Sequence, residues 1–141
     1  MAPLVLPYWL SVLGLLGLSG LSIVLALLSG ASKGFAGALS GPVLPADDAN
    51  RLYRIDRVHM NSVEALAPFV ASAILAMMVG VAPALLAALV LAHLAIRLVH
   101  AAVYLRGGPS AKGGGLRTAL YVAGAVLALA LIVATGWTAM Q

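Results

Sequence analysis

Four apolar stretches, each about as long as a membrane-spanning helix, are the feature that most constrains the fold of this chain. They cover residues from about 7 to 29, 60 to 79, 83 to 105 and 116 to 140. A helix needs roughly 20 apolar residues to cross the hydrocarbon core of a bilayer. Hydrophobic residues make up 63% of the chain and charged residues only 9%, which soluble domains do not show. The sequence therefore predicts an integral membrane protein.

The connections between these stretches predict how the helices are arranged. The second helix extends back beyond its apolar part to an N-terminus near Asp47 or Asp48, because carboxylates are good helix caps and favour the positive helix end. The turn from Gly80 to Pro83 is short enough to force an antiparallel hairpin. We expect a single all-α membrane domain over residues 1–141, an up-down bundle of four transmembrane helices. The helices are predicted at about 7–29, 48–79, 83–105 and 116–140.

Polar side chains are concentrated where the second helix begins. Four of them recur at i, i+3, i+7 and i+10, a spacing that places them on one face of a helix. These residues are Arg54, Arg57, Asn61 and Glu64. Two guanidinium groups, an amide and a carboxylate are therefore expected to project into one space.

The third helix carries a second polar stripe, whose members recur at i, i+4, i+7 and i+11. These residues are His93, Arg97, His100 and Tyr104. Arg97 lies well inside an apolar run, where an arginine should face protein and is best paired with a carboxylate. We expect Glu64 to be that partner, because it is the acidic residue placed inside an apolar span. His93 is interpreted as structural.

The fourth helix opens with Arg117, and Tyr121 follows one turn later. Both are expected at the same level as Tyr104 and Arg57, so that these side chains converge on one polar pocket. Such a pocket suits a small anion with more than one carboxylate, because guanidinium binds carboxylate bidentately. A neighbouring arginine or phenol would also lower the pKa of a ligand thiol from roughly 8.5 toward neutrality.

The distribution of basic residues predicts the orientation of the bundle. Basic residues flank or occupy the first and third connections, whereas the N-terminus, the 80–83 turn and the C-terminus have none. By the positive-inside rule, those two loops are cytoplasmic and both termini face the outer side. Arginine outnumbers lysine and alanine is abundant, which favours a bacterial source and hence the cell inner membrane.

Residue content and spacing argue against three kinds of chemistry. The chain has no cysteine, so any reacting thiol must come from a ligand. No two histidines and a carboxylate have the spacing of a metal triad, and no metal site is predicted. The basic residues are explained by topology, and no aromatic-interleaved basic patch points to nucleic acid.

These polar motifs resemble those of the MAPEG family, the membrane-associated proteins of eicosanoid and glutathione metabolism, and the chain is identified as a bacterial-type member. On the second helix the resemblance rests on the run Arg54-x-x-Arg57-x-His59-x-Asn61-x-x-Glu64, followed by Pro68. The third helix resembles the prostaglandin synthase branch in Arg97-x-x-His100-x-x-x-Tyr104. The start of the fourth helix resembles the family in Arg117-x-x-x-Tyr121. Chain length and the four spans also agree, so the resemblance covers essentially the whole chain.

The resemblance implies a homotrimer that binds glutathione between subunits near the cytoplasmic side. It implies a glutathione transferase or peroxidase, whose lipophilic electrophiles or hydroperoxides reach the thiolate from the membrane lipids. The implied glutathione contacts are Arg54, Arg57, Asn61, Glu64, His100, Tyr104, Arg117 and Tyr121. Among them, Arg117 is implied as the catalytic residue that stabilises the thiolate.

The chain departs from the family pattern at a few positions. Met60 stands where the prostaglandin synthase has a glutathione-contacting arginine, and Thr118 stands where it has a serine. The connection between the third and fourth helices is also longer, which leaves Arg106 or Lys112 as alternatives to Arg117 beside the thiolate.

Two other functions are compatible with the same residues. One is a small transporter or proton-coupled membrane protein that uses Glu64 and Arg97 as an intramembrane charge pair. Another is a membrane scaffold that has kept the fold without activity. A transporter should expose Glu64 to both sides of the membrane in turn, whereas an enzyme needs access from the cytoplasm alone.

Overall fold

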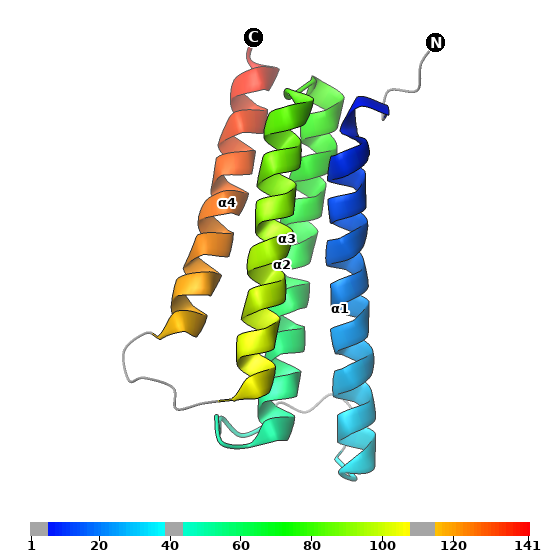
Figure 1. Cartoon of the computed structure of the whole chain (residues 1–141), viewed down its shortest axis with the longest axis vertical. Coiled ribbons are helices and arrows are strands. Elements are labelled where there is room, and N and C mark those ends of the chain that lie inside the picture. The colour runs from blue at the N-terminus through cyan, green and yellow to red at the C-terminus, as the bar shows by residue number, and fades with distance from the viewer. Residues whose placement is uncertain (1–5, 39–43, 108–114) are drawn as a thin grey trace.

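The computed structural model describes residues 6–38, 44–107 and 115–141, and its regular structure there is entirely helical. A short 3-10 turn, η1 (Leu6–Tyr8), leads into four long helices packed side by side (Figure 1). These are α1 (Trp9–Phe35), α2 (Arg51–Val79), α3 (Pro83–Arg106) and α4 (Leu116–Ala139). Each is long and apolar enough to cross a membrane. The predicted all-α four-helix membrane bundle is confirmed.

Helix α1 continues past the predicted end near residue 29, to Phe35. Its last turn holds Lys33, whose Nζ lies 2.7 Å from Oδ1 of Asp56 on α2. The hydroxyl of Ser29 donates to the same carboxylate oxygen at 2.9 Å. Because a buried charge needs a partner and hydrogen bonds, this cluster explains why the helix persists beyond its apolar stretch.

Helix α2 begins at Arg51, later than the N-terminus predicted near Asp47 or Asp48. The N-cap is Asn50, whose side-chain oxygen accepts a hydrogen bond from a backbone N–H of the first turn at 2.9 Å. Asp47 instead accepts from the backbone N–H of Ala49. All these residues are reasonable caps, and the chain uses Asn50, which leaves the Asp48 side chain to contact α4.

Helices α1 and α3 approach each other closely where α1 has glycine. A Cβ added at Gly14 would overlap the side chain of Val90, and one at Gly17 would overlap Leu94. Gly20 has nothing within 4 Å of such an atom. Small residues let transmembrane helices pack closely, so Gly14 and Gly17 permit the contact with α3, whereas Gly20 takes no part in it.

The buried core is divided into two apolar clusters with polar side chains between them. One cluster contains Phe69 of α2 and Val90 of α3, and a smaller one contains Val58 and Ala101 of the same two helices. The buried polar side chains between them along α2 and α3 include Asn61, His93, Arg97 and His100. This polar layer positions the candidate site inside the bundle.

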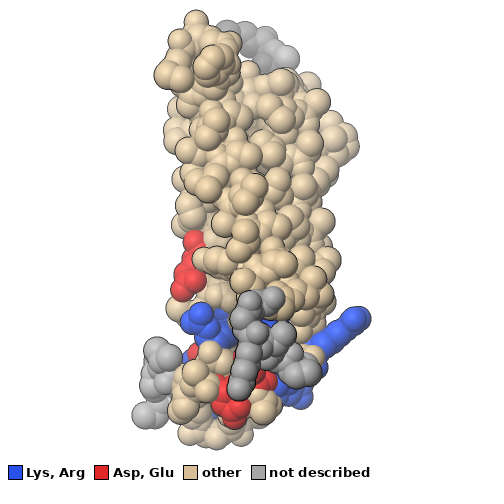
Figure 2. Space-filling model, turned by 90° about the vertical axis from the view of Figure 1, so that its left-hand side faces the viewer, with Lys and Arg blue, Asp and Glu red and all other residues tan. Residues whose placement is uncertain are grey.

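Aromatic residues and charges mark opposite ends of the molecule. Lys, Arg, Asp and Glu gather toward one end of the face in Figure 2. At the other end, Trp9 and Trp137 are exposed, as interfacial anchors should be. The neighbouring Tyr8 is buried instead and donates a 2.8 Å hydrogen bond to the carbonyl of Val81. That bond ties the start of α1 to the α2–α3 turn.

Candidate functional site

Seven of the eight side chains that the sequence predicts for the site line one pocket of about 260 Å³, here called the polar pocket. The residues around it are Arg57, Asn61, Glu64, His100, Tyr104, Arg117, Thr118 and Tyr121. Three helices contribute, α2, α3 and α4, each with residues spaced one turn apart along one face. The convergence expected from the separate helical stripes is therefore present.

Arg54 is the predicted residue that does not line this pocket. Its Nη1 donates to the backbone carbonyls of Asp48 at 2.8 Å and Ala49 at 2.9 Å. The guanidinium group also lies against Gly107, which has a positive φ of 72° and no room for a side chain. Arg54 therefore binds the chain segment before α2 and the end of α3, and its prediction as a direct ligand contact has no support from this geometry.

Arg117 is held from two sides at the start of α4. Its Nη1 and Nη2 donate to the two carboxylate oxygens of Asp48 at 3.0 and 3.1 Å. Its guanidinium carbon lies 4.8 Å from the ring centroid of Tyr104, within the range of a cation–π contact. Tyr104 also meets the ring of His100 edge-on at 5.1 Å. The guanidinium group of Arg117 is thus oriented before any ligand arrives.

The predicted ion pair between Arg97 and Glu64 is not formed. Arg97 is only 4% exposed and its Nη2 donates to the backbone carbonyl of Asn61. The ion pairs within the described ranges are Lys33–Asp56 and Arg117–Asp48. The Glu64 side chain lies on the exposed side of α2, so a backbone carbonyl meets the buried guanidinium group in its place.

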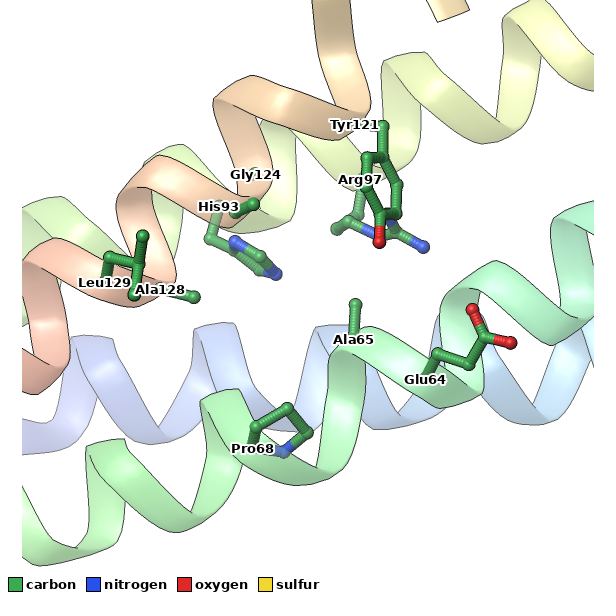
Figure 3. A pocket seen from close by; sticks show the side chains of 10 residues that line it. Glu64, Ala65, Pro68, His93, Arg97, Tyr121, Gly124, Ala128 and Leu129 are labelled. Atoms are coloured by element: carbon green, nitrogen blue, oxygen red, sulfur yellow. The ribbon is translucent and has the colours of Figure 1, made fainter. Parts of the chain in front are cut away.

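A second pocket, of about 330 Å³, adjoins the first and is here called the apolar pocket (Figure 3). It shares Glu64 and Tyr121 with the polar pocket. Arg97 and His93 also line it, among mostly apolar side chains from α2 and α4 that include Pro68, Ala128 and Leu129. The two pockets therefore form adjacent polar and apolar compartments between α2, α3 and α4.

His93 has both a packing role and a polar atom without a partner. Its ring stacks on Phe69 with centroids 3.9 Å apart, in keeping with the structural role that we expected. Its Nδ1 is buried and makes no hydrogen bond within the part of the chain that the structure describes. Since this side chain lines the apolar pocket, it can offer a ligand one hydrogen bond there.

Two residues near the site are absent from the set that the sequence predicts. Thr118 lines the polar pocket, as its position next to Arg117 and in place of a family serine could have indicated. Asp48 is expected from sequence to cap a helix, but it pairs with Arg117 across 69 positions of sequence. No spacing rule joins residues on a loop and on a distant helix, so no pattern in the sequence indicates this pair.

The site's chemistry follows from these groups. Arg57 and Arg117 supply guanidinium groups for anions, and Glu64 supplies a carboxylate for a cation. Among the described residues, no group of three or more His, Cys, Asp or Glu could hold a metal ion. The polar pocket thus places two cationic groups and one carboxylate around the same space.

Similarity to known proteins is found at the level of a family. No curated protein and no solved structure gives a significant match to the chain. The sequence model of the MAPEG family, in contrast, matches residues 6–137. This match includes α1, α2, α3, nearly all of α4 and the residues of both pockets. The chain belongs to the MAPEG family.

Proposed function

We propose that this protein binds glutathione in the polar pocket and uses its thiolate to attack lipophilic electrophiles or to reduce lipid hydroperoxides. The observation that carries the proposal is the meeting of seven predicted side chains around one pocket. Membership of the MAPEG family supports a glutathione-related function in the membrane. The charged and polar residues around the polar pocket support the choice of this pocket as the proposed binding site.

The charges of glutathione complement those of the pocket. The tripeptide has two carboxylates, one ammonium group, two amides and a thiol. Arg57 and Arg117 would bind anionic groups, and Glu64 would bind the ammonium group. Asn61 and Tyr121 would supply hydrogen bonds to the amide groups. Each class of polar group on the ligand thus has a matching class in the pocket.

Arg117 is the residue that we assign to the thiolate. A guanidinium group beside a thiol favours the charged form and lowers the pKa of the thiol. The alternative Arg106 is exposed and does not line the polar pocket, whereas Lys112 lies outside the described residues. The cation–π contact with Tyr104 supports Arg117, because it fixes the position of the charge.

The apolar pocket supplies a place for the second substrate. It adjoins the polar pocket at Glu64 and Tyr121. Lipophilic molecules dissolved in the bilayer would enter it between α2 and α4 and meet the thiolate at this shared boundary. In the transferase reaction, the sulfur would bond to the electrophilic carbon and the leaving group would depart with the bonding electron pair.

The polar pocket of a single subunit is small for the whole tripeptide. The polar pocket measures about 260 Å³, below the roughly 300 to 1,000 Å³ of typical ligand pockets. We therefore propose that neighbouring subunits of a homotrimer complete the site. The exposed apolar side chains of α1 and α4 are available for lipids or for such neighbours.

The decisive comparison for binding uses two arginines that are one turn apart on α2. Glutathione binding is measured by calorimetry on detergent-solubilised protein for wild type, Arg57→Ala and Arg54→Ala. We expect Arg57→Ala to weaken binding by about 10- to 100-fold, as for a lost charge-assisted hydrogen bond. Arg54→Ala should have a clearly smaller effect, because Arg54 contacts the backbone carbonyls of Asp48 and Ala49.

Wild-type protein that binds no glutathione at millimolar concentration would refute the proposal. Equal losses in the two variants would instead show that the polar pocket is not where glutathione binds. Tight binding without turnover against any electrophile or hydroperoxide would favour the inactive scaffold over the enzyme.

A further inference from the structure

The contact between Asp48 and Arg117 has no place in the proposed glutathione site. Asp48 lies in the segment between α1 and α2, and Arg117 lies in the first turn of α4. The two side chains form a bidentate pair, with hydrogen bonds of 3.0 and 3.1 Å. The Asp48 side chain is 37% exposed and that of Arg117 is 15% exposed. The carboxylate of Asp48 thus already binds the guanidinium group of Arg117, which we assign to stabilising the glutathione thiolate.

This carboxylate opposes the binding of a second anion. Both terminal nitrogens of the Arg117 guanidinium group already donate to Asp48, and its positive charge is balanced at hydrogen-bonding distance. A thiolate or a ligand carboxylate in the polar pocket must then share the guanidinium group or replace Asp48 there. In either case, the negative charge of Asp48 weakens the attraction.

We propose that Asp48 is a displaceable internal anion that restrains Arg117 in the empty site and gives way when an anionic ligand binds. This inference rests on the proposed function, because glutathione is the ligand considered. Asp48 acts on the ligand through Arg117, so it is a positioning residue and not a catalytic one.

Three features of the surroundings favour displacement of the Asp48 side chain alone. Its partial exposure lets water solvate the released carboxylate. The ring of Tyr104 remains against the Arg117 guanidinium group and keeps it in place. The backbone carbonyl of Asp48 is bound by Arg54 at 2.8 Å, so the main chain stays anchored while the side chain turns.

Substitution of Asp48 by asparagine tests whether the Asp48 carboxylate competes with the ligand for Arg117 or only holds Arg117 in place for it. The asparagine would keep the shape of the side chain and one acceptor oxygen, but the negative charge would be lost. If Asp48 competes with the ligand, Asp48→Asn should bind glutathione roughly two- to fivefold more tightly, the scale of a partly exposed ion pair. The pKa of the bound thiol should fall below its wild-type value, because the charge of Arg117 is no longer balanced.

Asp47→Asn is the matched control. It makes the same change of charge one residue away, at a side chain that accepts from the backbone N–H of Ala49. General electrostatic effects should appear in both variants, whereas loss of the Arg117 contact should appear only in Asp48→Asn. Asp48→Glu keeps the charge, so its thiol pKa should remain near that of the wild type. Helical content by circular dichroism verifies that each variant is folded.

The outcomes separate this inference from the proposed function. Tighter binding and a lower thiol pKa in Asp48→Asn than in the wild type support displacement. Wild-type binding with equal or weaker binding by Asp48→Asn overturns the inference and leaves the glutathione site standing. Failure of the wild type to bind glutathione at millimolar concentration overturns both.

Discussion

Lys33 and Asp56 form an ion pair between α1 and α2, with side chains that are only 11% and 12% exposed. Ser29 donates a further hydrogen bond to the carboxylate. Such a pair contributes less through its own attraction than through the penalty of leaving one charge buried alone. Because it joins α1 to α2, this ion pair stabilises the contact between the two helices at the charged end of the bundle.

Removal of one partner should therefore destabilise the protein strongly. We predict that Lys33→Met lowers the free energy of unfolding by about 3 kcal/mol, because Asp56 would stay buried without its cation. The double variant Lys33→Met/Asp56→Leu should recover most of this loss. Thermal unfolding in detergent measures both effects, and a double variant no more stable than the single one would contradict the explanation.

Helical spacing predicts the residues of the polar pocket better than it predicts their contacts. Arg54 and Arg57 lie on the same face of α2, and periodicity cannot distinguish them. Arg57 lines the pocket, whereas Arg54 is close enough to the start of α2 to bind the backbone carbonyls of Asp48 and Ala49. Arg97 gives a second example. It is buried as expected, but its partner is the backbone carbonyl of Asn61 and not the carboxylate of Glu64. Backbone acceptors are invisible to side-chain patterns.

At the scale of helices, the contact between α1 and α3 depends on the missing side chain of Gly14. An added Cβ would overlap Val90, which is itself fully buried. We predict that Gly14→Ala destabilises the bundle by about 1 to 3 kcal/mol, the range for overpacked cores. Gly20→Ala on the same helix should be nearly neutral, since nothing lies within 4 Å of its Cβ. Thermal unfolding of the two variants in one detergent tests this, and equal melting temperatures would refute it.

The helices themselves follow from apolar length and turn residues, and only their ends differ from prediction. Helix α1 is extended by the buried pairing of Lys33, a tertiary contact. Several suitable cap residues precede helix α2. The side chain of Asp48 among them binds Arg117, and Asn50 is the residue that caps the helix. Local sequence preferences allow several positions for a helix end, and tertiary contacts across the bundle determine which one is used.

For the whole molecule, the gathering of charge at one end predicts its orientation in the membrane (Figure 2). The chain has no cysteine, so single cysteines can report sidedness without background. By the positive-inside rule, an impermeant maleimide should label Gln141→Cys in intact cells. Ala46→Cys, in the segment before α2, should be labelled only after the membrane is opened. The reverse pattern would show that the basic end faces outward.

The oligomeric state cannot be predicted from the sequence pattern or from the burial of residues in one subunit. Large apolar side chains on α1 and α4 are exposed in the single chain, including Leu16, Leu27, Val126 and Val133. Lipid and a neighbouring subunit present similar apolar surfaces to such residues, so neither pattern nor burial separates the two. The homotrimer remains a proposal that follows from the family resemblance and from the small volume of the polar pocket.

The measurement that tests the central claim most directly is the pKa of glutathione's thiol in the complex. Ultraviolet absorbance of the thiolate is followed against pH for wild type, Arg117→Ala and Arg106→Ala. We predict that wild type lowers the thiol pKa by about one unit or more from its ordinary value near 8.5. Arg106→Ala should retain this shift and Arg117→Ala should lose it, because Arg117 lines the polar pocket and Arg106 does not. An unshifted thiol in wild type, or a shift that survives in Arg117→Ala, would contradict the account.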